Sequence, residues 1–482
     1  MRPKSIPHAD GLPWLGHMRE MAADPAAFMV QLALTHGPLV RFTLMGEQFV
    51  LLSDPMMIHD VLVTKANMFP KDDRDLTIMG SLMGYGLLTT NGAQHRTYRK
   101  LAQPAFHAKR IVTYGEAMTR YAEATVAEWH GGEIRDINAE MLRTTMYIVA
   151  KTLFNTERDA MAGGADAIGE AIHQLQKIAD YDFTWSGVIP QWWPNRANRT
   201  RNVARQQLYG LIEGMIAERR TAAIGGEVQD QGDLLSMLLL AEDEDGRRLN
   251  DREVRDEAIN LFVAGHETTS NALTWTWYLL SQHPTVEAKL HAELDRVLDG
   301  RTPTLADLEE LPYTAQVIKE SMRLYPPAWV LNTRLAKEDV ILSNETERYH
   351  VPKGTKLFIA PYVMHRLPQY FATPAQFRPE RFTPEFEKSL PRFAYMPFGG
   401  GPRICIGNAF AMMEAQLVLA TIAQQYALRL APDAKVEPEP LITLTAKHGM
   451  KMQLIKRTQE SGSSQTTPSA EPLPATTQPV FA

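Results

Sequence analysis

The only cysteine of the chain, Cys405, lies in the glycine-rich run Phe398-Gly399-Gly400-Gly401-Pro402-Arg403-Ile404-Cys405-Ile406-Gly407. Successive glycines permit backbone angles and close approaches that a β-carbon would forbid. The run leads into a predicted helix, and helix N-terminal amides together with the Arg403 guanidinium would stabilise a thiolate there. The pattern therefore predicts a thiolate that can bind a metal such as iron. The alternative is an unreactive thiol in the core.

A second candidate is the run Ala264-Gly265-His266-Glu267-Thr268-Thr269, inside a predicted helix over residues 250–282. An acid followed by alcohols is unusual in the middle of a helix that carries Leu261-Phe262-Val263 just before it. Gly265 costs such a helix about 1 kcal/mol relative to alanine. Glu267 and Thr268 are therefore candidates for chemistry. The alternative is a Thr268 hydroxyl that only bonds back to a helix carbonyl.

Two further patterns combine acidic and basic side chains. Glu320 and Arg323 stand three apart on one face of a predicted helix, and Arg381 follows in the run Phe377-Arg378-Pro379-Glu380-Arg381-Phe382. After a turn at Asn91-Gly92, His95 and Arg99 are one helical turn apart and share a side of their helix. Exposed pairs of this kind are common, so each pattern depends on its context.

The composition is that of an ordinary globular protein. Of 482 residues, 44% are hydrophobic and 22% are charged, with a net charge of −6, so nothing indicates a nucleic-acid partner. The sequence has no run of 18 apolar residues and no secretory signal at its start, so we expect no membrane anchor. One cysteine excludes an internal disulfide and fits a reducing compartment, so we expect a cytoplasmic protein.

The elements that must position these residues are mostly helices. Residues 92–298 read as largely helical, with loops at 185–194 and 225–232, and a helix at 25–35 ends at Gly37-Pro38. Expected strands are 39–44, 48–52, 340–342 and 356–360, followed by a long coil at 371–404 and a helix at 406–428. Asp54-Pro55 is a predicted helix start. The pattern predicts a mainly α fold with small β-sheets, an α+β class, and a polar, disordered tail at 457–482.

Taken in order, these motifs resemble the cytochrome P-450 superfamily of haem-thiolate monooxygenases, over about residues 10–456. The resemblance is closest to soluble bacterial haem domains of the fatty-acid-hydroxylase type, which are often fused to a reductase. It implies a triangular helical haem domain with a β-rich N-terminal part over residues 1–456. The tail is then either a solvated end or the start of a linker.

The resemblance also implies roles for individual residues. Cys405 would ligate the iron of haem b, Phe398 would pack beside it, and Thr268 and Glu267 would deliver protons to dioxygen, with Ala264 and Gly265 leaving room over the haem. The residues implied for the haem propionates are His95, Arg99, Arg334 and Arg403. Glu320, Arg323 and Arg381 would form a buried structural network that locks the long coil.

The same resemblance nominates a substrate pocket lined by Leu87, Leu88, Ala264, Ala328, Trp329, Val330 and Ile442. Met79, Leu82 and Met83 would lie on a lid beside it, although any of these apolar residues could instead be ordinary core. Arg96, Lys100, Lys109 and Arg110 would receive an electron donor by charge complementarity.

The implied reaction inserts one atom of O2 into a lipophilic substrate such as a fatty acid, terpenoid or steroid, using two electrons. The electrons would come from a ferredoxin, flavodoxin or reductase, and we expect a monomer. The alternatives are a peroxide-driven peroxygenase of the same fold, a haem-binding sensor or carrier without catalysis, and a haem-free helical protein with a buried thiol. Glu267 and Thr268 argue against the peroxygenase.

Overall fold

The computed structural model describes residues 3–158, 165–185, 192–222, 228–242 and 246–457. It shows a mainly helical protein with small separate sheets, so the predicted fold class is confirmed. The predicted tail at 457–482 lies outside the described residues except for Arg457. That residue belongs to the folded body, because its amide donates to Gln425 O and its guanidinium pairs with Asp295 at 2.7 Å.

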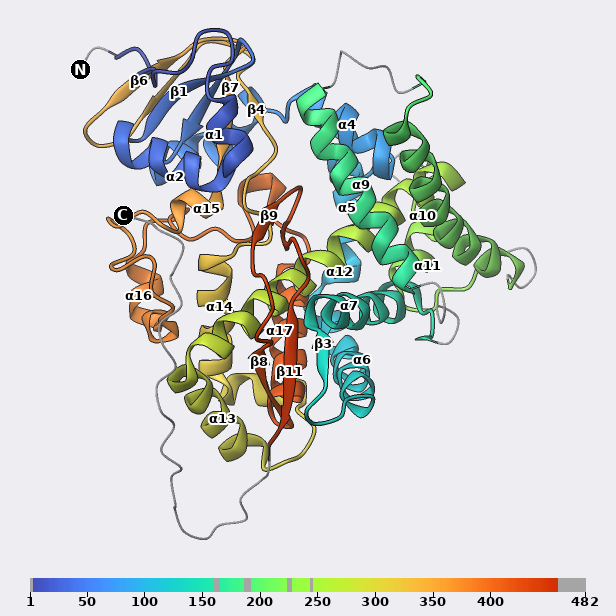
Figure 1. Ribbon diagram of the computed structural model, residues 1–482. Helices are drawn as coiled ribbons and strands as arrows, with labels where there is room; N and C mark the ends of the chain where they lie inside the picture. Colours follow the sequence, from blue (N-terminus) through green and yellow to red (C-terminus); the bar gives the residue numbers. More distant parts are fainter. Residues whose placement is uncertain (1–2, 159–164, 186–191, 223–227, 243–245, 458–482) are drawn as a thin grey trace.

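The β-rich part brings strands from the N-terminal segment together with strands from residues 334–359 at one corner of the molecule (Figure 1). Its main sheet has the order β1-β2-β7-β4, in which β2 and β7 are parallel and the other neighbours antiparallel. The expected strands at 39–44 and 48–52 are confirmed by β1 and β2, which form a hairpin through the turn at Gly46. The elements here are α1 (Met18–Ala23), α2 (Pro25–His36), β1 (Leu39–Leu44), β2 (Glu47–Leu52), β4 (Arg334–Leu335), β5 (Val340–Ser343), β6 (Arg348–Val351), β7 (Lys356–Ile359) and α15 (Pro361–Met364).

Helix boundaries in this region follow local capping chemistry. The Asp24 side chain accepts the Ala27 amide at the start of α2, and Gly37 ends that helix with φ +88°. Asp54 accepts the amides of Met56 and Met57 at the start of α3 (Pro55–His59), as the Asp-Pro pair predicts. Each bond satisfies a donor that the first helical turn cannot pair internally.

The helical body surrounds one long central helix, α12 (Asp251–Gln282). A capping box starts it: Asn250 accepts the Glu253 amide, and the Glu253 carboxylate accepts the Asn250 amide. Helix α12 packs against α7, α10, α14 and α17. The remaining helices are α4 (Asp73–Met83), α5 (Gly92–Ala102), α6 (Ala108–Ala127), α7 (Ile137–Phe154), α9 (Ala165–Trp185), α10 (Arg196–Thr221), α11 (Leu234–Leu240), α13 (Pro284–Leu298), α14 (Pro312–Leu324), α16 (Pro384–Ser389) and α17 (Asn408–Ala423).

One predicted helix is wrong at its C-terminal end. The expected helix at 406–428 stops at Ala423, and β8 (Tyr426–Leu430) follows. A short apolar run cannot by itself distinguish a buried helix from a buried strand. Here antiparallel pairing with β11 (Lys451–Lys456) decides the strand. The remaining strands are β3 (Ile134–Asp136), which also pairs with β11, and the pair β9 (Pro438–Pro440) and β10 (Leu444–Ala446).

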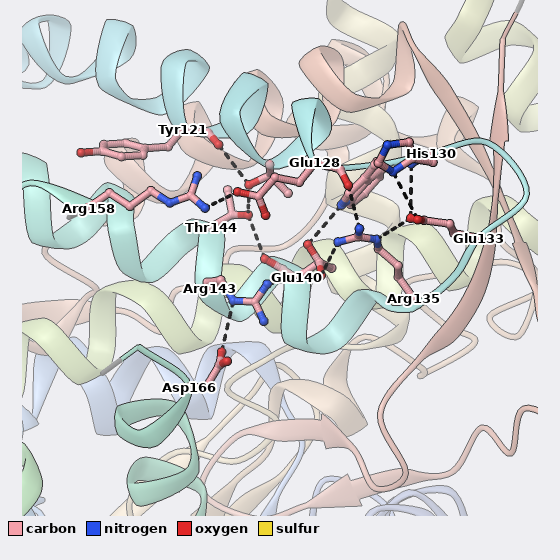
Figure 2. Close-up of polar contacts among 12 residues, drawn as sticks. Tyr121, Glu128, His130, Glu133, Arg135, Glu140, Arg143, Thr144, Arg158 and Asp166 are labelled. Carbon is pink, nitrogen blue, oxygen red and sulfur yellow. Dashed lines mark hydrogen bonds and ion pairs between the residues drawn. The ribbon is translucent and has the colours of Figure 1, made fainter. Parts of the chain in front are cut away.

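A polar network fastens α6 and β3 to α7, which is the main partner of α12. Figure 2 shows Glu140 of α7 beside Arg135 and Arg143, and one of its carboxylate oxygens lies 3.4 Å from each guanidinium group. Its other oxygen accepts the indole N–H of Trp129 at 3.1 Å. Arg143 also reaches Asp166 of α9 at 3.1 Å. These contacts fix the position of α7, which packs against α12, relative to its neighbours.

The buried apolar side chains form two clusters. The larger one lies around α12 and includes Phe262, Trp275 and Leu417, whereas the second lies under the β-rich part and includes Phe42, Leu51 and Leu357. Among the described residues, no helix is both long and apolar enough to cross a bilayer.

Candidate active site

The cysteine loop is held in a tight shape by its own backbone and by its neighbours. The Cys405 amide donates to Phe398 O at 2.9 Å, and the Ile404 amide donates to Gly401 O at 3.0 Å. Gly401 has φ +67°, and a β-carbon there would lie 1.9 Å from Leu62 O. At Gly400 a β-carbon would lie 2.0 Å from the Phe393 ring. The loop therefore requires glycine at both positions for reasons of space.

The Cys405 side chain is exposed, at the end of this loop and just before α17. Burial of its surroundings raises the pKa of the thiol, whereas the Gly407 amide and the Arg99 guanidinium act to lower it. The predicted role of Arg403 beside the thiolate is wrong. Arg403 turns to Thr90 O at 2.7 Å and to Asn91 Oδ1 at 2.9 Å, while Arg99 donates to Ile404 O at 2.8 Å.

Basic side chains from four separate segments gather beside the loop. We call Lys71, His95, Arg99, Arg334 and Arg403 the basic cluster. Burial, and then the charge of Arg403, lowers the pKa of Arg334 to about 10 and that of His95 to about 3. Burial and the neighbouring arginines hold the pKa of Lys71 well below its usual range.

The basic cluster fits a group that carries carboxylates. Like charges that repel one another in a buried place are stable only where anions compensate them. Asp75 is the anion that acts on both Lys71 and Arg334. The Nε atom of Arg334 is buried and forms no hydrogen bond with any residue that the structure describes. A haem offers two propionates for such cations and an iron for the nearby Cys405 thiolate, so these residues fit haem b.

The face of α12 that carries Ala264 and Thr268 is partly exposed. The Thr268 hydroxyl donates to Ala264 O at 2.9 Å, which is the bond to a helix carbonyl that the structural alternative predicts. Its oxygen can still accept a hydrogen bond from water or from a ligand. The expectation that Gly265 leaves room over the haem is wrong. A β-carbon there would lie 3.1 Å from Val149 of α7, so Gly265 permits close packing of two helices instead.

The Glu267 carboxyl points away from solvent into a small polar enclosure. Its Oε1 accepts the Thr443 hydroxyl at 2.6 Å and the Gln176 amide group. Burial raises the pKa of Glu267. The carboxyl therefore favours a bound proton, and it links α12 to α9 and to the strand pair β9-β10.

The predicted pocket residues converge on α12 from three segments. Leu88 is attached by its amide, which donates to Asn260 Oδ1 at 3.0 Å. The stretch around Ile442 is attached through Thr443 and Glu267. The stretch 327–329 joins it, because the Leu444 amide donates to Pro327 O and the Trp329 indole donates to Leu441 O at 2.7 Å.

Most of these side chains keep a partly exposed surface, as a pocket wall requires. They are Leu88, Ala264, Ala328, Val330 and Ile442, whereas Leu87 is buried. Trp329 differs, since its ring belongs to the apolar cluster under the β-rich part. The expected lid residues Met79, Leu82 and Met83 lie on α4 and pack into the larger core, so the ordinary-core alternative describes them better.

The structure brings together the acid and the bases that we expected to lock the long coil. Glu320 contacts Arg323 at 2.7 Å and Arg381 at 3.0 Å, and all three side chains are buried. The two guanidinium groups also donate to carbonyls of the coil, at Ala372, Thr373, Pro374 and Gln376, and Arg323 donates to His365 O at the end of α15. These contacts fix residues 372–376 of the coil, which form no helix or strand. Further along, the expected coil at 371–404 is interrupted by α16 and by 3-10 turns at Pro379–Arg381 and Gly401–Arg403.

The family model for cytochrome P450 matches residues 6–453. The chain belongs to the cytochrome P450 family. Members of this family are monooxygenases that use haem b, in agreement with the thiolate loop and the basic cluster.

Two bacterial relatives are similar over most of this P450. Cyclooctatin synthase of Streptomyces melanosporofaciens is 38% identical over 441 residues, which cover 90% of this chain and 92% of the relative. Pentalenene oxygenase of Streptomyces avermitilis is 34% identical over 456 residues, which cover 93% and 96%. Neither name refers to fatty acids, so the expected special likeness to fatty-acid hydroxylases finds no support in them.

The residues expected to receive an electron donor are divided by the structure. Arg96 and Lys100 of α5 are exposed and, with His95, Arg99, His107 and Pro402, line a surface hollow of about 510 Å³ beside the cysteine loop. Arg110 lies 3.8 Å from Asp230 and donates to Gly232 O, so it is engaged within the P450. The Lys109 side chain lies outside the described residues.

Sequence reasoning missed polar residues that only packing brings to the site. Lys71 had no local signal, and Gln176 and Thr443 are ordinary polar residues until they meet at Glu267. Glu414 had one signal, since it is the only acid of the apolar helix α17. Its carboxyl is fully buried beside Thr269, and burial raises its pKa well above the usual value.

Proposed function

We propose that this P450 hydroxylates or otherwise oxygenates an apolar cyclic substrate of the terpenoid class, using O2 and two electrons from a ferredoxin, flavodoxin or reductase. The observation that carries the monooxygenase activity is the cysteine loop beside the basic cluster, which together match haem b. The substrate class rests on the relatives, whose names include cyclooctat-9-en-7-ol 5-monooxygenase and pentalenene oxygenase.

In this proposal Cys405 binds the iron as a thiolate, and Arg99 with the Gly407 amide stabilises its charge. The basic cluster, with Lys71 added to the four residues expected from the sequence, holds the propionates. When bound, the haem activates dioxygen and supplies the oxidising power for attack on a C–H bond. The remaining steps belong to the protein, which must orient substrate, exclude water and deliver protons.

Thr268 and Glu267 serve the delivery of protons in this proposal. Thr268 stands on the partly exposed face of α12, where its hydroxyl can accept a proton from water and pass one on. Glu267 lies on the adjoining, buried face with a pKa raised by burial, so it can hold the next proton. Because the two side chains lie on different faces of α12, a water molecule must carry the proton between them.

The pocket wall supports an apolar substrate. Leu88, Ala264, Ala328, Val330 and Ile442 carry no charge and keep a partly exposed surface. Ala264 shares a face of α12 with Thr268, and Leu88 is held by Asn260 one turn before Ala264. We place the electron donor at the basic hollow of α5, where Arg96 and Lys100 attract an acidic protein. Iron ligation requires Cys405 to remain a reduced thiol, and the cytoplasm keeps thiols reduced, so we propose a cytoplasmic location.

The decisive experiment is the spectrum of the reduced carbon monoxide complex. Only thiolate ligation shifts its maximum strongly to the red, so the wild type should show this shift and Cys405→Ala should lose it. Ile404→Val is the control for disturbance of the loop. Retention of the red-shifted spectrum and of oxygenation in Cys405→Ala would overturn the proposal.

The reaction is tested with pentalenene and lauric acid as probes. We expect pentalenene to change the haem spin state and to yield oxygenated product with reduced ferredoxin, and lauric acid to do so more weakly. Equal rates with hydrogen peroxide alone would instead indicate a peroxygenase. Binding without product under either condition would indicate a sensor or carrier.

A further inference from the structure

The segment 84–91 carries Leu87 and Leu88 and connects α4 to α5, but it forms neither helix nor strand. Its amides therefore need acceptors from elsewhere. Three successive parts of the segment find them on α12. The Tyr85 amide donates to Asp256 at 3.0 Å, the Leu87 amide to Glu257 at 2.7 Å, and the Leu88 amide to Asn260 at 3.0 Å.

The contact is too close for any residue but glycine at its centre. A β-carbon on Gly86 would lie 2.7 Å from Asn260 Cγ and 2.8 Å from Glu257 Oε2. The Asn260 side chain also donates to Met83 O at 3.0 Å, so the end of α4 is held as well. The backbone of the segment is thus pressed onto the side chains of α12.

The opposite side of the segment is bound by the basic cluster. Lys71 donates to Leu88 O at 2.6 Å, and Arg403 donates to Thr90 O at 2.7 Å. The segment therefore lies between α12 and the residues that we assign to the propionates. Asn260 also stands one helical turn before Ala264 and two before Thr268 on the same face of α12.

Glu257 is the central group of this contact. Its side chain is fully buried, one carboxylate oxygen accepts the Leu87 amide, and the other forms no hydrogen bond within the described part of the chain. No lysine, arginine or histidine forms an ion pair with it among the described contacts, so a charge on Glu257 is not what the contact uses. Asn260, whose side-chain amide is neutral, accepts the Leu88 amide in the same way.

We propose that Glu257 and Asn260 are specificity-determining positioning residues, which hold the buried Leu87 and its partly exposed neighbour Leu88 by their backbone and so fix Leu88 as one wall of the substrate pocket. The side chain that accepts the Leu87 amide matters as an acceptor, not as a charge. The claim about the substrate pocket rests on the proposed haem function. The contact between the segment and α12 does not depend on that function.

The contact is tested by hydrogen exchange of the peptide that covers residues 84–91. Glu257→Leu removes the acceptor at similar size, so exchange should rise by more than about tenfold, whereas Glu257→Gln should remain near the wild type. The matched control is Glu293→Leu, because Glu293 is another buried acid that accepts backbone amides, those of Tyr313 and Thr314. It should leave the exchange of 84–91 unchanged.

Gly86→Ala provides a second route if Glu257→Leu does not fold. Its β-carbon must displace the segment from Glu257 and Asn260, so it should raise the exchange in the same way. Gly210→Ala is its control, since a β-carbon on Gly210 of α10 meets nothing within 4 Å.

The pocket is tested with imidazole and 4-phenylimidazole as iron ligands of the haem-loaded protein. Glu257→Leu and Gly86→Ala should weaken 4-phenylimidazole about tenfold, which is about 1.4 kcal/mol, and change imidazole less than about twofold. The proposal would be overturned if hydrogen exchange of residues 84–91 were unchanged in both Glu257→Leu and Gly86→Ala. It would also be overturned if this exchange rose while the ratio of the affinities for 4-phenylimidazole and imidazole stayed the same. If the wild type bound neither azole, the haem function and the specificity claim would both fail, while the exchange result would still decide the contact.

Discussion

At the scale of single residues, the site depends on buried groups whose ordinary charges are disfavoured. Glu257 is the clearest case, because burial raises its pKa to about 8 against the small opposing effect of the Leu87 amide. His95 shows the reverse, with a pKa lowered to about 3 by burial and by neighbouring cations. Such groups connect pH to stability and to the shape of the site.

Glu257 predicts a loss of stability at alkaline pH. Its folded pKa of about 8 lies above the unfolded value, so its contribution is complete below about pH 4.5 and is lost as the pH rises through 8. The thermal unfolding midpoint of the wild type should therefore fall by roughly 5 °C more between pH 6 and pH 9 than that of Glu257→Gln. Thermal unfolding of both proteins across this range checks it. Parallel curves would show that Glu257 does not titrate there.

If Thr268 delivers protons, its replacement should reduce the amount of product formed per electron consumed. Thr268→Ala should lower the product formed per electron roughly tenfold, because the hydroxyl no longer passes protons, and Thr268→Ser should restore most of it. Thr276→Ala is the matched control, since Thr276 makes the same back-bond, to Ala272 O at 2.7 Å, two turns further along α12. An equal defect in both alanine variants would assign Thr268 a structural role only.

At the scale of elements, the first part of the long coil over residues 371–404, before α16, is held by buried side chains of α14 and of the coil itself. Glu320 and Arg323 of α14 supply the charges, and Arg381 returns from the coil to meet them. The sequence predicted this trio through the family resemblance. It did not predict the carbonyls that the two arginines hold, because these depend on how the coil folds around α14.

The trio predicts a large loss of stability on neutralisation of its acid. Glu320→Gln leaves two buried guanidinium groups without a countercharge and should cost about 3–5 kcal/mol, with weaker retention of haem. Glu287→Gln is the control, because Glu287 pairs only with Arg429, whose side chain is 36% exposed, and should cost less. Denaturant unfolding and haem content measure both. A cost for Glu320→Gln no larger than that for Glu287→Gln would contradict a locking role.

At the scale of the whole molecule, the helical body and the β-rich part are joined through the site. Arg334 comes from β4, His95 and Arg99 from α5, and Arg403 from the cysteine loop. The basic hollow beside these residues faces outward while the pocket wall lies against α12. Electrons and substrate would therefore reach the haem from different sides.

The hollow predicts a reduction rate that depends on salt. Arg96→Glu with Lys100→Glu should raise the KM for reduced ferredoxin about tenfold at low salt, and the difference should shrink as salt screens the charges. Lys353→Glu with Lys388→Glu makes the same change of charge at exposed positions elsewhere and should have little effect. Equal effects of the two pairs would show that net charge, not this hollow, governs the encounter.

The sequence alone determined those features that depend on local chemistry. The glycines of the Cys405 loop, the helix start at Asp54-Pro55 and the strands at 39–44 and 48–52 follow from neighbouring residues, so their patterns could be interpreted directly. The tertiary structure alone decided which distant residues meet. Lys71 joins Arg334 and Arg403, Gly265 faces Val149, and Glu257 accepts the Leu87 amide, because these contacts arise from helix packing and no spacing along the chain encodes them.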